Sequence, residues 1–103
     1  MRAAALDKAA IDASLKVLPR WALSSAAPSI SRRLTFADFN AAFGFMTRIA
    51  LAAEKADHHP EWSNVWNRVD IVLTTHDAGG LTDKDFALAA VIDAVAAEAG
   101  ATQ

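Results

Sequence analysis

The sequence predicts an α+β fold of two layers, in which a four-stranded antiparallel sheet has three helices packed on one face. Two observations support this prediction. Apolar residues recur at helical spacing in three segments, and two pairs of short strand-like runs lie between them, in the order α-β-β-α-β-β-α. Strands joined by short turns are antiparallel, and three helices with one apolar face each are all buried when they cover the same side of a sheet.

The first helix and the first strand pair are expected in the first third of the chain. Apolar residues at helical spacing predict a helix over residues 7–18, which Asp7 can cap and Pro19 ends. Residues 21–23 and 30–35 are then expected to form two short strands around a turn, because a segment of Ser, Ala and Pro separates them.

The second helix is the strongest element of the sequence. Thr35 is expected to cap it, and it must end at or before His59, because Pro60 disfavours the helical conformation in the residue ahead of it. Its predicted apolar face contains residues at intervals of three and four, namely Phe36, Phe39, Phe43, Met46, Ala50 and Ala53. The residues interpreted as core, and not as a cofactor site, are Phe39, Phe43, Phe45 and Met46.

A second strand pair is expected after Pro60. Residues 62–66 and 69–75 are rich in aromatic and β-branched side chains and are expected to pair in a hairpin that turns near Asn67. Alternation predicts one face of the second strand, made of Val69, Ile71, Leu73 and Thr75.

The last helix is expected after the pair Gly79-Gly80, which interrupts regular structure. Thr82 can cap it, and Asp83 and Asp85 place carboxylates in its first turn, at the positive end of the helix dipole. Gly100 ends it. Its predicted apolar face consists of Leu88, Ala89, Ile92, Val95, Ala96 and Ala99.

Size and composition indicate one globular domain, expected over residues 1–103. The hydrophobic fraction of 53% and the charged fraction of 21% are typical of folded proteins and not of disordered ones. A domain of this size buries only about 60 to 70% of the surface of its unfolded chain, so association with further copies is a natural source of stability. We therefore expect a homo-oligomer.

The charge pattern argues against several classes of partner. Ten basic residues face twelve acidic ones, the net charge is -2, and no basic run is present, so direct contact with nucleic acid is not expected. Asp7 and Lys8 interrupt the apolar start, and no stretch has the roughly 18 to 20 apolar residues of a membrane span. The chain has no cysteine, which excludes disulfides and thiolate chemistry and is compatible with a cytoplasmic location.

Residues suited to proton transfer gather in one part of the chain, because all three histidines, His58, His59 and His76, lie within residues 58–76. The unperturbed pKa of histidine, about 6.5, allows it to give or take a proton near neutral pH. If the hairpin pairs about Asn67, the exit of the second helix and the end of the following strand meet, and the three imidazoles can share one rim. Taken singly, each histidine also has a structural explanation, as a partner of helix-end carbonyls or of a loop.

Nearby side chains can support these histidines. Glu54 lies four residues before His58 on the same helical face, and it or Asp57 can orient an imidazole and hold its tautomer. The alternative is a solvated ion pair worth under about 1 kcal/mol. Trp62 and Trp66 are expected on the same face of the first hairpin strand, and Trp62 and Trp21 can supply flat aromatic walls for a flat heterocycle. Ordinary core or interface packing is the favoured explanation for Trp66 and an equal alternative for Trp62.

Two other kinds of site find little support. Adjacent histidines lack the spacing that places two ligands on one helical face, so no metal is expected. The Gly79-Gly80 pair ahead of Thr82 can form an anion site, but no phosphate-binding glycine pattern surrounds it, and a tight turn is the simpler explanation. No serine lies in the strained turn of a hydrolase nucleophile.

Residues 54–69 (EKADHHPEWSNVWNRV) and 75–82 (THDAGGLT) resemble the signature of the pterin-4a-carbinolamine dehydratases. The resemblance extends through Leu18-Pro19 with Trp21, residues 36–53 and residues 85–92, and so covers nearly the whole chain from about residue 6. It implies an antiparallel four-stranded sheet backed by three helices, in agreement with the fold predicted above.

The same resemblance implies a hydro-lyase that uses no cofactor or metal. Its substrate would be 4a-hydroxytetrahydrobiopterin or a related 4a-hydroxytetrahydropterin, left when aromatic amino acid hydroxylases use their pterin, and its products would be a quinonoid dihydropterin and water. The family's catalytic histidines correspond to His58, His59 and His76, and its further substrate contacts to Pro60, Thr75, Asp77 and Ala78. One residue departs from the pattern: Trp66 stands where the family usually has Tyr, which removes any role for a phenolic hydroxyl.

Dehydration needs one proton delivered to the departing 4a hydroxyl and another removed from the adjacent ring nitrogen. The working hypothesis is that His58 and His76 share these roles while His59 binds and orients the pterin.

Two alternatives come from other functional classes. Some animal members of the family act as dimerisation cofactors of a homeodomain transcription factor, and a pterin-binding regulator of an associated hydroxylase would bind ligand without turnover.

Overall fold

The computed structural model describes residues 4–24 and 28–102. In chain order, the elements are helix α1 (Lys8–Lys16), strands β1 (Ala22–Ser24) and β2 (Ser29–Thr35), helix α2 (Phe39–Ala56), strands β3 (Glu61–Val65) and β4 (Arg68–Leu73), the 3-10 turn η1 (His76–Ala78) and helix α3 (Asp83–Glu98). This is the predicted order α-β-β-α-β-β-α. Most of the predicted Ser, Ala and Pro turn between β1 and β2 lies at residues 25–27, outside the described residues.

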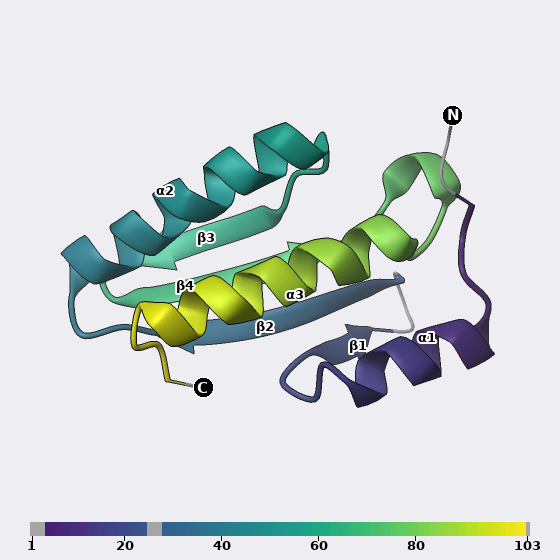
Figure 1. Ribbon diagram of the computed structural model, residues 1–103, viewed down its shortest axis with the longest axis horizontal. Helices are drawn as coiled ribbons and strands as arrows, with labels where there is room; N and C mark the ends of the chain where they lie inside the picture. The colour runs from purple at the N-terminus through teal and green to yellow at the C-terminus, as the bar shows by residue number, and fades with distance from the viewer. Residues whose placement is uncertain (1–3, 25–27, 103) are drawn as a thin grey trace.

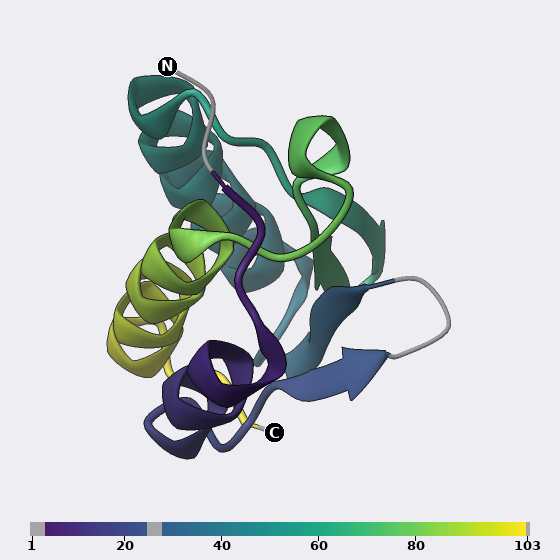
Figure 2. The ribbon, with the colours of Figure 1, turned by 90° about the vertical axis from the view of Figure 1, so that its right-hand side faces the viewer.

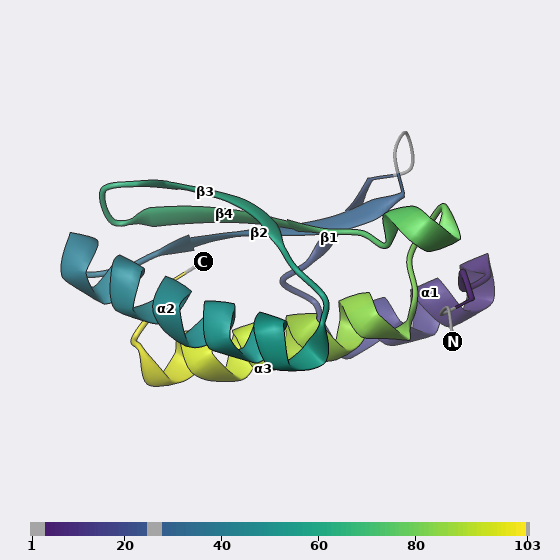
Figure 3. The same ribbon diagram turned by 90° about the horizontal axis from the view of Figure 1, so that it is seen from above.

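The four strands form one sheet in the order β1-β2-β4-β3, and every neighbouring pair is antiparallel. The three helices lie in a single layer on one side of this sheet (Figures 1, 2 and 3). The predicted two-layer α+β fold is therefore confirmed. The other face of the sheet is left without a helical cover (Figure 3).

The hydrophobic core lies between the two layers. Alternate residues of β2 and β4 point toward the helices and are fully buried, namely Ile30, Leu34, Val69, Ile71 and Leu73. Each such side chain contributes about 1.5 to 3 kcal/mol through burial. The predicted apolar face of α3 packs against them, so the periodicity of this helix is confirmed. The strand alternation is confirmed for Val69, Ile71 and Leu73, whereas Thr75 lies beyond the end of β4. The predicted cap of α3, Thr82, is also confirmed.

Helix α2 begins later than predicted. Its N-cap is Asp38, whose side chain accepts a hydrogen bond from the backbone N–H of Ala41 at 2.8 Å. The predicted cap, Thr35, is instead the last residue of β2 and pairs with Arg68, so its backbone is committed to the sheet. Phe36, predicted inside the helix, lies in the connection and is buried there against Phe45.

The buried face of α2 also differs from the predicted one. Phe39 is 49% exposed and Phe43 is 55% exposed, so the interpretation of both as core residues is wrong, and Ala50 is exposed as well. Successive residues of a helix are rotated by about 100°, so Phe43 and Phe45 point in nearly opposite directions. The sheet is covered by the other side of the helix, which consists of Ala42, Phe45, Ile49 and Ala53.

The centre of the β3–β4 hairpin lies half a residue earlier in the sequence than predicted. Its pairs, such as Ser63 with Asp70 and Val65 with Arg68, centre between residues 66 and 67 and not on Asn67. Trp66 occupies the turn in the left-handed region, with φ of 52°, and is 65% exposed, so it does not share the strand face of Trp62. Two-residue hairpin turns favour residues that accept positive φ, so Trp66 adopts this conformation at a cost, and residue preference alone does not predict the observed pairing.

Candidate active site

The end of α2 brings His58 and His59 to the start of β3. The helix stops at Ala56, and Asp57 follows in the left-handed conformation, with φ of 52°. The backbone N–H of His58 then donates to the Ala53 carbonyl at 3.1 Å. Pro60 cannot continue a helix, and β3 begins directly after it. The prediction that α2 ends before His59 is confirmed.

His76 reaches the same end of the hairpin from the other strand. Strand β4 ends at Leu73, and His76 opens η1 three residues later. Glu61, the first residue of β3, pairs with Val72 near the end of β4. In Figure 1, the α2–β3 connection and η1 both lie at the end of the β3–β4 hairpin opposite its turn. The segments that carry the three histidines therefore adjoin the same end of this hairpin.

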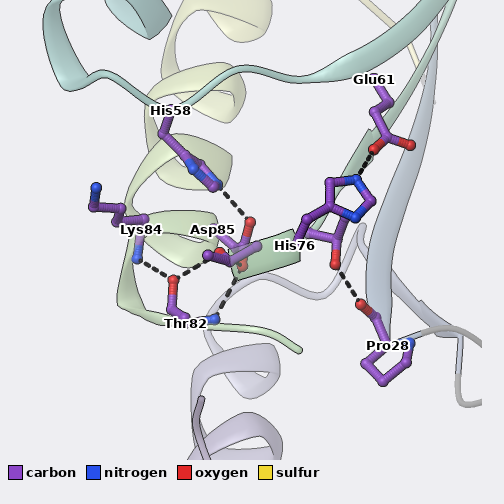
Figure 4. A network of polar contacts seen from close by, with 9 residues as sticks. Pro28, His58, Glu61, His76, Thr82, Lys84 and Asp85 are labelled. Carbon is purple, nitrogen blue, oxygen red and sulfur yellow. Dashed lines mark hydrogen bonds and ion pairs between the residues drawn. The ribbon is translucent and has the colours of Figure 1, made fainter. Parts of the chain in front are cut away.

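His58 is buried, with 8% of its surface exposed, and contacts a fully buried carboxylate. Its Nε2 lies 2.6 Å from Oδ1 of Asp85 (Figure 4). Asp85 belongs to the first turn of α3, where its side chain and that of Thr82 form a reciprocal capping box. Such a cap satisfies two free backbone donors of the helix, so the carboxylate that contacts His58 also holds the start of α3.

The second oxygen of Asp85 accepts two further hydrogen bonds, from the Thr75 hydroxyl at 2.7 Å and from the backbone N–H of Thr82 at 2.9 Å. Since an ionised carboxylate only accepts hydrogen bonds, His58 Nε2 carries the hydrogen of its contact with Oδ1. A neutral His58 ring then keeps Nδ1 as its proton acceptor. Since the Thr75 hydroxyl donates to Asp85, it accepts from the Thr82 hydroxyl, which is 2.9 Å away.

His76 has a carboxylate partner of its own. Its Nε2 lies 2.6 Å from Oε2 of Glu61, and both side chains are exposed (Figure 4). The pair borders a cavity of about 310 Å³, near the lower end of the sizes usual for small-molecule sites. The cavity is lined by Pro28, Ser29, Glu61, Val72, Thr74, Thr75, His76, Gly79 and Gly80.

The third histidine forms a separate pair at the end of α2. His59 Nε2 lies 2.6 Å from Oε1 of Glu54, and both side chains are exposed. Glu54, expected from its position four residues earlier to orient His58, contacts His59 instead, and the partner of His58 is Asp85. Asp57 is the left-handed C-cap of α2 and is exposed.

Among residues 4–24 and 28–102, neither of the two cavities that contain a histidine is bordered by all three imidazoles. His58 lines a smaller cavity of about 150 Å³ between α2 and α3, together with Lys84 and mainly apolar side chains. His76 lines the larger cavity on the strand side, and His59 lines neither of these two. The connection between the two cavities runs through Thr75, which borders the larger one and donates to Asp85, the partner of His58.

The remaining predicted site residues fall into two groups. Thr75 lines the larger cavity, and Asp77 and Ala78 belong to η1 beside it, while Pro60 separates His59 from β3. The two tryptophans do not line either histidine cavity. Trp21 is buried and donates from Nε1 to Asp93 at 2.8 Å, and Trp62 packs against the core.

Sequence reasoning missed three polar partners of the histidine sites: Asp85, Thr82 and Glu61. In the sequence, Asp85 and Thr82 are identifiable only as residues at the start of the last helix. The alternation of β3 offered one signal for Glu61, because it places residue 61 on the face opposite to that of Trp62. Within residues 4–24 and 28–102, no group of three or more potential ligands is arranged to hold a metal ion.

The helices of the described residues include none with the length and apolar content needed to cross a bilayer.

A family model described as pterin 4 alpha carbinolamine dehydratase matches residues 4–95 of this chain. A relative from Rhizorhabdus wittichii, named after the same enzyme, is 64% identical over 83 residues, which cover 81% of this chain and 86% of the relative. A relative from Rhizobium johnstonii with the same name is 55% identical over 97 residues, 94% of this chain and 96% of the relative.

Two solved structures share the fold. One is described as a transcriptional coactivator/pterin dehydratase from Brucella melitensis; it has a TM-score of 0.86 and 42% identity, and the match covers 89% of this chain and 98% of that one. The other is described as a pterin dehydratase-like protein that is a RuBisCO assembly factor in the α-carboxysome; it has a TM-score of 0.66 and 25% identity, with 74% and 88% of the chains covered. Proteins with this architecture are thus described with more than one role.

Proposed function

The chain belongs to the pterin-4a-carbinolamine dehydratase family, and on this premise we propose that it is a hydro-lyase acting on 4a-hydroxytetrahydrobiopterin or a related 4a-hydroxytetrahydropterin. The products are a quinonoid dihydropterin and water, so the reaction recycles the pterin of an aromatic amino acid hydroxylase. The pterin is the substrate, and no cofactor or metal takes part. The observation that carries this proposal is the link from His58 through Asp85 and Thr75 to the cavity that His76 borders.

The proposed mechanism uses two imidazoles as an acid–base pair. A protonated imidazole delivers a proton to the departing 4a hydroxyl, which leaves as water, and a neutral imidazole removes the proton from the adjacent ring nitrogen. His58 and His76 share these roles. His76 borders the cavity with its Nε2 held by Glu61, so its Nδ1 remains for proton transfer, whereas His58 is linked to the cavity from its Nε2 through Asp85 and Thr75. Each proton transfer accelerates a reaction by about a hundredfold to ten-thousandfold.

Binding of the pterin is assigned to residues around the larger cavity. Its volume of about 310 Å³ is compatible with a small bicyclic ring system. The side chain of Val72 and the glycines after η1 give it apolar and close-fitting walls, and Thr75 supplies a hydroxyl. Pro60, Asp77 and Ala78 complete the proposed contacts, and His59 orients the ring.

The experiment that tests this function is stopped-flow absorbance of 4a-hydroxytetrahydropterin decay with and without the protein. Acceleration that scales with protein concentration supports the dehydratase. Binding of a stable pterin analogue without acceleration would instead support a regulator of a hydroxylase, and neither binding nor acceleration would support a non-catalytic module. The last alternative has one specific observation in its favour, since proteins of the same fold are described as a coactivator and as an assembly factor.

A homodimer or homotetramer is part of the same proposal. Phe39 and Phe43 contact each other on the outer side of α2, with ring centroids 5.7 Å apart, and both are about half exposed. Trp66 lies at the same end of the molecule, because Asn67 donates to the Phe36 carbonyl at 2.9 Å. An aromatic side chain presents roughly 150 to 250 Å², so these three leave roughly 300 to 400 Å² of apolar surface in water.

Such an area matches the largest patch of a typical monomer, and two copies that meet through it approach the contact area of a stable dimer once polar neighbours are included. A second copy of the chain is therefore the proposed occupant. Light scattering coupled to size-exclusion chromatography tests this, with a monomer at micromolar concentration as the contradicting result.

The proposed location is the cytoplasm, in keeping with a sequence without cysteine, and the net charge of -2 disfavours direct nucleic-acid contact.

A further inference from the structure

Glu61 occupies a position that the sheet fixes relative to His76. It is the first residue of β3 and pairs with Val72 of β4. Val72 lies four residues before His76, the first residue of η1. Its neighbour Trp62 packs against the core, and alternation along the strand turns Glu61 to the opposite, uncovered face. Glu61, Val72 and His76 all line the cavity of about 310 Å³.

The contact between the two side chains specifies one nitrogen of the ring. His76 Nε2 lies 2.6 Å from Oε2 of Glu61, as Figure 4 shows. A carboxylate accepts hydrogen bonds, so Nε2 carries the hydrogen, and Nδ1 of a neutral ring becomes the acceptor. Without a partner, an exposed imidazole would exchange freely between its two neutral tautomers, and only one of them would present an acceptor at Nδ1.

We propose that Glu61 is the positioning residue of His76, holding the ring in the tautomer whose Nδ1 takes part in proton transfer. This inference rests on the proposed dehydratase activity. Glu61 does not touch the reacting atoms and acts only through His76. The arrangement repeats, on the strand side, what Asp85 does for the buried ring of His58, where a carboxylate also occupies Nε2.

A matched pair in the same chain separates this role from an ordinary surface contact. Glu98 and Arg48 are also 2.6 Å apart and also exposed, yet neither borders the cavity of His76. An exposed ion pair contributes about 0 to 1 kcal/mol to stability. Both pairs can therefore be broken without unfolding the protein, and only the Glu61 pair is expected to affect proton transfer.

The test compares Glu61→Gln with Glu98→Gln in the full chain. For Glu61→Gln, kcat for 4a-hydroxytetrahydropterin dehydration is expected to fall about 10- to 100-fold, the range typical of residues that orient a functional histidine, while KM stays within about twofold because the glutamine keeps the shape of the cavity wall. Glu98→Gln is expected to keep kcat within about threefold of the wild type. A Glu61→Gln enzyme with unchanged kcat, or an equal loss in Glu98→Gln, overturns the proposal.

A second readout reports the tautomer directly. In ¹⁵N-labelled protein, the two ring nitrogens of His76 have distinct chemical shifts that identify which one carries the hydrogen. The Nε2–H form is expected to dominate the neutral wild-type ring, and Glu61→Gln is expected to give a mixture. An unchanged pattern overturns the proposal. An inactive wild-type protein would refute the dehydratase assignment, and with it the catalytic part of this inference, whereas an active wild type with an unaffected Glu61→Gln variant refutes the role of Glu61 alone.

Discussion

The Thr75 hydroxyl lies 2.7 Å from Oδ2 of Asp85, while the other oxygen of the same carboxylate lies 2.6 Å from His58 Nε2. Thr75 is also the neighbour of His76 in sequence and borders its cavity. The Asp85 carboxylate on α3 thus connects the buried His58 with Thr75, the residue that precedes His76. The connection is made of hydrogen bonds to a fully buried group, which are costly to leave unmade, so substitutions along it have large and specific expected effects.

Asp85→Asn is the most direct change to this connection. The amide replaces one oxygen acceptor by a donor, so one of the partners of Asp85 loses its hydrogen bond, and His58 is no longer held in one tautomer. We expect a loss of about 1 to 3 kcal/mol in the free energy of unfolding and a fall in kcat/KM of about 10- to 100-fold. Chemical denaturation and dehydration kinetics measure the two effects. Asp83→Asn, in the same helical turn but exposed, is the control and should leave both quantities near wild type.

Thr75→Val removes only the hydroxyl at nearly constant volume. Asp85 then loses one donor, and the Thr82 hydroxyl loses its acceptor, so unfolding should become easier by about 1 to 2 kcal/mol. The dehydration rate should fall with it, because the Asp85 carboxylate that orients His58 is less firmly held. Thr74→Val is the matched control, since Thr74 lines the same cavity but bonds the Pro28 carbonyl. Equal kinetic losses in both variants would argue against a specific role of the Thr75–Asp85 contact.

The two faces of α2 should respond differently to truncation. Phe45 is buried in the core, so Phe45→Ala is expected to cost about 3 to 5 kcal/mol at every protein concentration. Phe43→Ala should change the stability of the dilute protein by less than about 1 kcal/mol, because its ring is already half exposed. Denaturation at several protein concentrations distinguishes the two cases. A large, concentration-independent loss in Phe43→Ala would mean that the assignment of the buried face is incorrect.

Trp66→Asn should stabilise the hairpin. Trp66 adopts φ of 52°, a conformation that costs a bulky residue roughly 1 kcal/mol or more and that Asn tolerates well. An increase of about 0.5 to 1 kcal/mol in the free energy of unfolding is therefore expected. The increase should be read at low protein concentration, where the proposed contact of Trp66 with a second copy is absent. A clear loss of stability under those conditions would indicate that the Trp66 ring packs within its own chain.

Much of the fold could be predicted from the sequence, because its signals are local. Pro60 stops α2, and the composition of residues 61–73 favours a hairpin whatever surrounds it. The buried side of α2 could not be predicted in the same way. Phe39, Phe43 and Phe45 place aromatic rings on two sides of one helix, and only the position of the sheet decides which side is covered.

The site was predictable at the level of its histidines and not of their partners. The three histidines stand out by their type and by their closeness in sequence. The partner of His58 lies 27 residues away, on a helix whose docking geometry no local pattern specifies. Glu54 illustrates the limit of spacing arguments, because the chain reverses direction after Asp57 and brings His59, not His58, within 2.6 Å of it.

The measurement that tests the central claim most directly is the stopped-flow decay of 4a-hydroxytetrahydropterin with the wild type and with His58→Ala and His76→Ala, each shown to be folded by circular dichroism. The wild type is predicted to accelerate the decay, and each variant to lose about a hundredfold or more of that acceleration. A folded His76→Ala protein that retains full activity would contradict the shared acid–base roles, and a wild type without acceleration would contradict the dehydratase itself.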